Sequence, residues 1–130
     1  MADLLKDIEQ FLISAGKATA DGLDIFRDQL PSTPDKVIVL REYDGLAASF
    51  GSEALDRSVQ ILVRALTYAE ARALCWELYG ALVDPIAPIK DFTPARWGIV
   101  SGRTSPSKMN IDSQNRTSFV FNIGVTTLKD

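Results

Sequence analysis

The sequence predicts an α+β domain, in which a mainly antiparallel sheet of about four strands carries two helices on one face. Hydrophobic residues follow a helical period in two segments and alternate with a period of two in others. These segments occur in the order helix, strand, strand, helix, strand, strand (α-β-β-α-β-β). The chain has 130 residues, of which 46% are hydrophobic and 24% charged. That composition is typical of a single globular domain, here residues 1–130, with a buried core.

The first helix is expected over residues 3–15. Asp3 is suited to the N-cap and Gly16 to the end of the helix. The polar face is mainly acidic, which argues against binding to a membrane surface. The apolar stripe is therefore expected to pack on the sheet, and it consists of Leu4, Leu5, Ile8, Phe11, Leu12 and Ala15.

Two strands are expected next, over residues 36–41 and residues 57–66. The second strand has one apolar face, formed by Val59, Ile61, Val63 and Ala65. Its other face is mixed, with Ser58, Gln60, Leu62 and Arg64. This pattern predicts that one side of the sheet faces the core and that the other is covered or paired.

The second helix has a clear beginning, because Thr67 and Glu70 have the spacing of a capping box. Pro85 prevents its continuation. Cys75 lies on the apolar stripe of this helix, and we expect it to be a buried structural thiol.

The last third of the chain is predicted to contain an extended connector at residues 83–96 and a short strand at residues 97–100. A polar segment that contains Pro106 follows, over residues 102–110, and is expected to be a loop. The final strand is expected over residues 115–127. Two helices on one face leave the sheet edges open, and exposed edges are often covered in an oligomer.

The residue content excludes several kinds of chemistry. The chain has no histidine, which excludes Ser-His-Asp and Cys-His nucleophile systems. One cysteine forms no internal disulfide and no cysteine cluster for a metal. Carboxylate pairs for acid–base catalysis stay open, but no pattern selects a pair. We therefore expect no enzymatic activity, no cofactor and no metal site.

Charge also limits the partners. The chain carries 14 basic and 17 acidic residues, a net charge of −3, which argues against a dedicated nucleic-acid binder and a polybasic membrane anchor. Residues 1–56 carry five basic and eleven acidic groups, whereas residues 57–130 carry nine basic and six acidic groups. Two interpretations are open. Successive copies could meet through acidic and basic surfaces, as in a ring, or the two halves could interleave in space.

The sequence resembles the small minor capsid or tail-terminator (head–tail joining) proteins of long-tailed bacteriophages. The resemblance covers most of the chain and rests on the segments at residues 35–40, 43–45, 58–64, 77–79, 112–116 and 119–122. One departure concerns the last loop. The family often has a Gly-Asp/Glu-Gly type of turn there, whereas this chain has Asn110, Ser113 and Gln114.

The resemblance implies a structural virion protein that forms a hexameric ring at the head-proximal end of the tail and is assembled in the host cytoplasm. Such a ring stops growth of the tail tube and offers a surface to head-completion proteins. Genomic DNA passes through its lumen without specific binding, for which an acidic chain is suited because a basic lumen would hold phosphates.

Five basic residues are candidates for contacts between subunits or with the tail tube. Arg57 and Arg64 are expected to pair subunits, and Arg103, Lys108 and Arg116 are expected to contact a neighbouring subunit or the tube protein. For residues 103–116, between the last two strands, a solvated hairpin tip is the other interpretation.

The alternative function is that of a monomeric α+β binding or accessory domain, with a small-molecule pocket beneath Trp76 and Trp97. The two functions predict different structures. A ring requires a shared interface of about 1,600 Å² or more. A ligand-binding domain requires an enclosed apolar pocket within one subunit.

Overall fold

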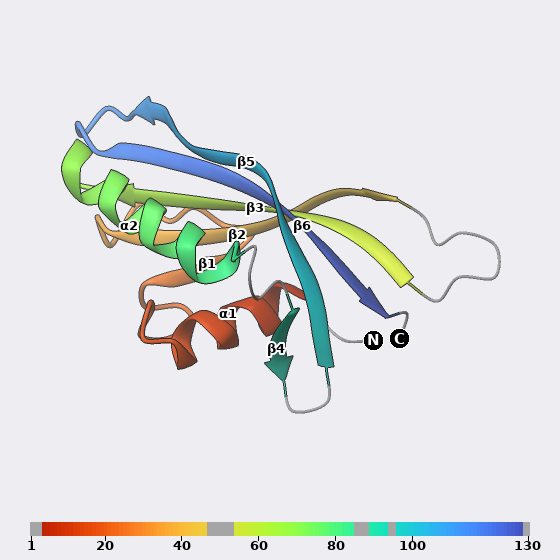
Figure 1. The fold of residues 1–130 in the computed structure, drawn as a ribbon. Helices are drawn as coiled ribbons and strands as arrows, with labels where there is room; N and C mark the ends of the chain where they lie inside the picture. The colour runs from red at the N-terminus through yellow and green to blue at the C-terminus, as the bar shows by residue number, and fades with distance from the viewer. Residues whose placement is uncertain (1–3, 47–53, 85–88, 94–95, 129–130) are drawn as a thin grey trace.

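The computed structural model describes residues 4–46, 54–84, 89–93 and 96–128 of the chain. Two helices and six strands lie in this described part (Figure 1). The helices are α1 (Leu4–Ser14) and α2 (Tyr68–Leu82). The strands are β1 (Ile25–Arg27), β2 (Val37–Leu46), β3 (Ala54–Ala65), β4 (Ile89–Thr93), β5 (Arg96–Ile111) and β6 (Thr117–Leu128).

Within the described residues, the strands form one sheet in the order β1-β2-β3-β6-β5-β4. β1 runs parallel to β2, and every other neighbouring pair is antiparallel. The predicted α+β class is confirmed, but the expected number of about four strands was wrong. β1 has only three residues, too few to show a period, and β4 lies in the segment that was predicted to be a connector.

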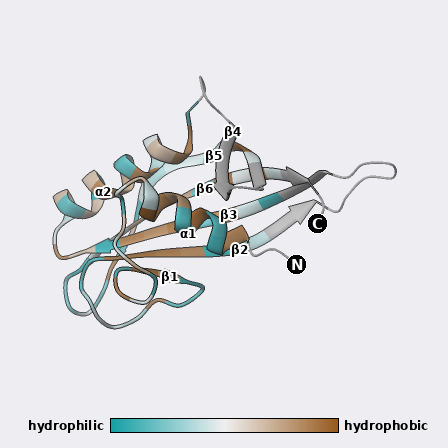
Figure 2. Cartoon of the chain, turned by 90° about the horizontal axis from the view of Figure 1, so that it is seen from below, coloured by the Kyte–Doolittle hydropathy of each residue, from teal (hydrophilic) through white to brown (hydrophobic). Residues whose placement is uncertain are grey.

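Both helices lie on the same face of the sheet (Figure 1). Their apolar stripes bury residues of the strands at alternate positions, as the pleat of a strand requires. Figure 2 shows hydrophobic stretches along the strands beneath the helices. The largest fully buried side chains of this core include Leu4, Ile8 and Leu12 of α1, Leu78 and Leu82 of α2, and Ile61 and Phe121 of the sheet.

The opposite face of the sheet is mostly polar, with a small apolar cluster at one end. Val37, Val39 and Leu62 are buried there, and Phe26 packs against them. Further along the same strands this face becomes polar. The mixed pattern predicted for β3 therefore reflects a face that is covered at one end only.

The helix signals in the sequence agree with the structure. Gly16, just beyond α1, has a φ of 76°, the left-handed conformation expected after a helix end. The hydroxyl of Thr67 accepts a hydrogen bond from the backbone N–H of Glu70 at 3.2 Å. The predicted roles of Asp3 and Pro85 lie outside the described residues.

The Thr67 cap gives a direct test of this helix start. Replacing Thr67 with alanine is expected to lower the free energy of unfolding by about 1 kcal/mol, because a first-turn N–H loses its acceptor. Urea denaturation followed by circular dichroism measures the change. Thr67→Ser keeps the hydroxyl and should stay close to wild type. Equal losses in both variants would contradict the capping role.

The segment at residues 102–110 was expected to be a loop, and this expectation was wrong. These residues continue β5 up to Ile111, paired with β6. Irregularities of register between Gly102 and Thr104, Thr104 and Ser107, and Lys108 and Asn110 absorb the additional residues. Pro106 is tolerated because an edge strand leaves alternate N–H groups unpaired. The turn itself is short and is closed by two hydrogen bonds at 3.0 Å, from Asp112 N–H to Arg116 O and from Asn115 N–H to Asp112 O.

Candidate functional site

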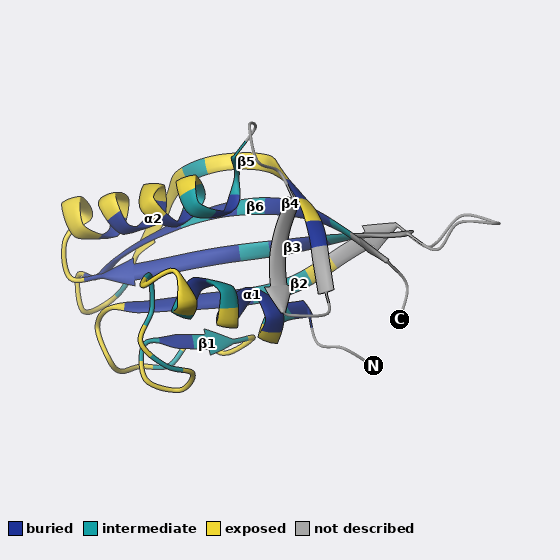
Figure 3. Ribbon diagram, turned by 60° about the horizontal axis from the view of Figure 1, so that its bottom comes forward, coloured by how far each residue is buried: buried dark blue, intermediate teal, exposed yellow. Residues whose placement is uncertain are grey.

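The outer edge of β5 is the longest open strand edge in the described structure. β4 pairs only with the beginning of β5, where Ile89 lies opposite Ile99 and Thr93 opposite Arg96. Beyond that point β5 pairs with β6 on one side, and residues 101–111 are exposed except for the half-buried Pro106 (Figure 3). An open edge of this kind is a common place for contact with another chain.

Two of the predicted residues lie on this edge. Arg103 and Lys108 are both exposed. The guanidinium of Arg103 crosses β6 at Gly124, where an added methyl group would lie 2.5 Å from its Nε. Lys108 lies opposite Phe119 of β6. The structure therefore places these two charges on the edge strand β5, whereas the sequence predicted them in a loop.

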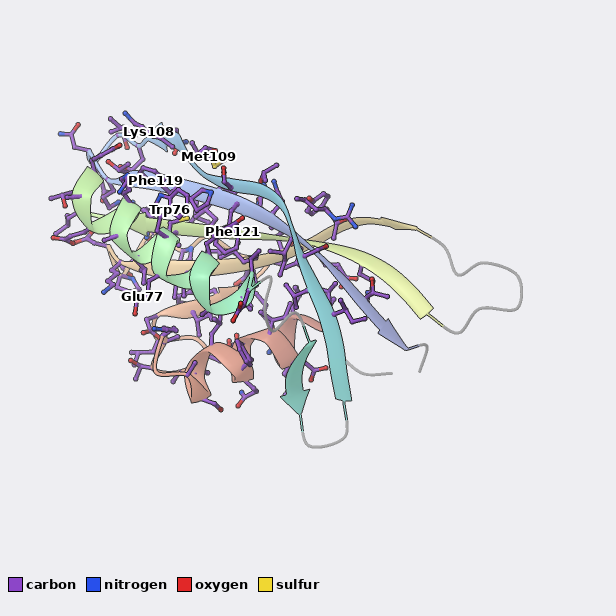
Figure 4. All side chains as sticks on the ribbon, viewed as in Figure 1. Trp76, Glu77, Lys108, Met109, Phe119 and Phe121 are labelled. Atoms are coloured by element: carbon purple, nitrogen blue, oxygen red, sulfur yellow. The ribbon has the colours of Figure 1, made fainter. Side chains whose placement is uncertain are left out.

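The side of α2 next to β5 carries aromatic and basic side chains. Tyr68 packs edge-on against Phe119, with ring centroids 5.3 Å apart. Trp76 is 41% exposed, and the Cζ of Arg72 lies 5.9 Å from the centre of its ring, a cation–π contact. The exposed Met109 is on the adjoining part of β5 (Figure 4). We call Tyr68, Arg72, Trp76, Lys108 and Met109 the α2–β5 flank.

The other end of the sheet carries an acidic turn at residues 19–24, beside β1. The carboxylate of Asp24 accepts hydrogen bonds from Thr19 N–H at 3.0 Å and Ala20 N–H at 3.1 Å. The carbonyl of Asp24 also accepts from Ile38 N–H of β2 at 2.9 Å. These bonds hold the turn in place. Leu23 at its tip is 57% exposed.

Arg64 and Arg116 lie together in a buried cluster at the end of β3 and β6. The guanidinium of Arg64 donates to the carbonyls of Pro34 at 2.6 Å and Asp35 at 3.2 Å. That of Arg116 donates to Ser32 O at 2.6 Å. The two arginines are only 3% and 5% exposed. They tie the segment at residues 28–36 to the sheet.

Charges in this cluster affect one another. Burial lowers the pKa of Arg64, and the neighbouring Arg116 lowers it further. Asp112 offsets part of this effect. Asp112 itself accepts at Oδ2 from the Arg116 guanidinium at 2.8 Å and at Oδ1 from the Arg116 backbone N–H at 2.9 Å. These hydrogen bonds, that of the Arg116 backbone first, lower the pKa of the Asp112 carboxyl.

The lowered pKa predicts how stability depends on pH. Because folding favours the ionised form of Asp112, its contribution is complete above the ordinary Asp pKa of about 3.9 and is lost as pH falls through the lower folded value. The stability difference between wild type and Asp112→Asn should therefore be largest near neutral pH and should narrow below about pH 4. Urea titrations at several pH values measure this difference. A difference that stays constant down to pH 2 would contradict the prediction.

Arg57 lies elsewhere, near the other end of β3. Its guanidinium forms an ion pair and a hydrogen bond with Glu42 of β2, and both side chains are partly buried. The five predicted residues therefore fall into three groups: the exposed Arg103 and Lys108, the buried Arg64 and Arg116, and Arg57, which pairs with Glu42 of the neighbouring strand. Their roles in assembly remain predictions.

Cys75 has a packing role, and the two hollows on the surface are small. Cys75 is buried, and burial raises the pKa of its thiol to about 12. A hollow of about 250 Å³ lies beside the acidic turn, and one of about 200 Å³ lies on the polar sheet face. Both are open, and both are smaller than typical ligand pockets of about 300–1,000 Å³. Trp76 lies on the surface, and the side chain of Trp97 is outside the described part.

These features describe a small α+β domain with one long open strand edge. The chain belongs to the bacteriophage tail terminator protein family, whose model matches residues 11–129, nearly its whole length. It is thus a structural component of the phage tail. A search of curated proteins found no match. No helix among the described residues is long and apolar enough to cross a membrane.

Proposed function

We propose that this protein forms a hexameric ring at the head-proximal end of the phage tail, stops growth of the tail tube and provides the surface for head joining. Membership of the tail terminator family is the observation that carries this proposal. The open edge of β5 supports it, because residues 101–111 offer an exposed strand that a neighbouring subunit could cover.

The proposed partners are copies of the chain itself, the tail tube protein and a head-completion protein. Residues 1–130 act as one domain, and the ring is assembled in the host cytoplasm. DNA passes through its lumen without specific binding, which the net charge of −3 favours. The virion role involves no enzymatic step.

The structure favours outward contacts for Arg103 and Lys108, which are exposed. Arg57, Arg64 and Arg116 would act on assembly mainly by keeping the subunit in shape, since each bonds within its own chain. Combined alanine substitution of Arg57 and Arg64 tests whether they matter to assembly. Unchanged assembly in a folded double variant would remove both from the proposal.

Tube polymerisation tests the function directly. Purified tail tube protein should form tubes whose mean length falls as this protein is added, and electron microscopy should show one ring at one end of each tube. Light scattering over a wide concentration range gives the mass of the free protein, against 14.3 kDa for one chain. Tubes of unchanged length without end rings would overturn the proposal.

The alternative, a monomeric domain with a small-molecule pocket, has less support. The two hollows described above are open to solvent, and Trp76 lines neither of them. Such a domain would stay monomeric at all concentrations and would leave the tube lengths unaltered.

A further inference from the structure

We propose that the acidic turn at residues 19–24 of one copy docks on the α2–β5 flank of the next copy. This inference rests on the proposed ring and identifies the two surfaces that join its subunits. The occupant of the flank is thus a second copy of this chain.

Charge complementarity is the first argument. Residues 19–28 contain Asp21, Asp24 and Asp28 but only one basic residue, Arg27. Asp21 and Asp28 pair within the chain, with Arg27 at 3.6 Å and with Arg41 at 3.9 Å, but both contacts are long, and the two acidic side chains stay 49% and 77% accessible. The flank carries Arg72 and Lys108, and no acidic residue occurs between residues 101 and 111. Opposite charges of this kind steer two copies into one orientation.

Both surfaces also have an apolar centre. Leu23 projects from the tip of the turn and is 57% exposed. On the flank, Tyr68 is 52%, Trp76 41% and Met109 51% exposed. A single exposed leucine is ordinary, but here it lies among carboxylates, and the exposed aromatic rings lie among cations. Aromatic side chains with basic neighbours are typical of the centre of an interface.

The backbone of the turn is already held by hydrogen bonds, so it needs little further ordering when it docks. Three backbone N–H groups, those of Thr19, Ala20 and Ile38, are bonded to side-chain or backbone oxygens of Asp24. Leu23 N–H donates to Ala20 O at 3.1 Å. A surface that is already fixed loses little conformational entropy on binding.

The two surfaces lie at opposite edges of the sheet. β1 and the turn are at one end of the strand order, and the exposed part of β5 is at the other (Figure 3). A contact between unlike surfaces leaves one of each free on every dimer, so it can repeat, and it forms a ring when the rotation from one copy to the next closes. Pro106 and the irregular register of β5 disfavour addition of a further strand, so side chains make this contact.

Two charge variants test the contact. Arg72→Glu with Lys108→Glu makes the flank acidic. Asp21→Lys with Asp28→Asn makes the turn region basic, and asparagine is chosen because residue 28 has a φ of 61°. Each variant alone should fail to form rings or to cap tubes. Mixed in equal amounts they should form rings of alternating copies, because each new surface meets its opposite.

The control is Lys6→Glu, a charge reversal at an exposed residue of α1 outside both proposed surfaces. It should assemble like wild type. Leu23→Ser tests the apolar contact. It should raise the protein concentration needed for ring formation at least tenfold. Circular dichroism and melting curves confirm that every variant is folded before its mass and tube capping are measured.

The outcomes separate this inference from the proposed function. If wild type caps tubes and both charge variants also cap them alone, the docking surfaces are wrong but the function stands. If folded variants fail alone and also fail when mixed, complementarity of these two surfaces is refuted. If wild type itself neither forms rings nor caps tubes, the proposed function fails.

Discussion

Replacing Arg116 with alanine is expected to lower the free energy of unfolding by about 3 kcal/mol, because buried hydrogen bonds of a charged group are lost together. Arg116 is 5% exposed and bonds both the Asp112 carboxylate and the carbonyl of Ser32. Its loss removes the link between the β5–β6 turn and the segment at residues 28–36. Urea denaturation measures the change.

Lys108→Ala is the matched control for this variant. Lys108 is exposed, and its substitution should change stability by less than about 0.5 kcal/mol. The contrast divides the predicted interface residues by their physical role. If Arg116→Ala unfolds like wild type but loses assembly, Arg116 is a contact residue and its role as an internal anchor is wrong.

The sequence predicted the elements whose signals are local. The stripe of α1, the cap of α2 at Thr67 and the alternation in β3 and β6 each depend on residues a few positions apart. β1 and β4 were missed, because three to five residues show no period and their pairing depends on distant strands. The full length of β5 was missed because glycine, serine and proline usually indicate turns, whereas here an irregular edge strand accommodates them.

The candidate site was likewise predicted only where its signals are local in the sequence. Exposure of Arg103 and Lys108 follows from polar surroundings in the sequence, and the structure agrees. The burial of Arg64 does not follow, because its acceptors are carbonyls of Pro34 and Asp35, about 30 residues away. Every residue has a carbonyl, so no residue type marks it as a partner. The spacing of Asp112 and Arg116 was the one local signal available for this cluster.

The α2–β5 flank was also missed as a unit. Its residues on α2 and its residues on β5 are more than 30 positions apart along the chain. The packing of α2 on β5 and β6, which includes Tyr68 on Phe119 and Tyr79 on Phe121, brings them together. The proposed assembly and the core packing therefore depend on the same contact between α2 and the sheet.

Replacing Phe121 with alanine tests that contact and is expected to lower the free energy of unfolding by about 3–5 kcal/mol. Phe121 is fully buried, and its ring centroid lies 5.4 Å from that of Tyr79 in an edge-on contact. The alanine leaves a cavity beneath α2. The melting temperature should fall by about 10–20 °C, as measured by calorimetry.

Trp76→Ala gives the comparison that separates packing from docking. Trp76 is 41% exposed and its ring packs edge-on against Tyr79, with centroids 5.5 Å apart, so its loss should cost about 1–2 kcal/mol of stability, less than the loss of Phe121, and it removes an aromatic ring from the α2–β5 flank. We expect Phe121→Ala to lose stability first and assembly as a consequence, and Trp76→Ala to lose assembly with its fold intact. Equal stability losses in both variants would mean that Trp76 belongs to the core. Full assembly of Trp76→Ala would mean that its ring makes no contact with the next copy.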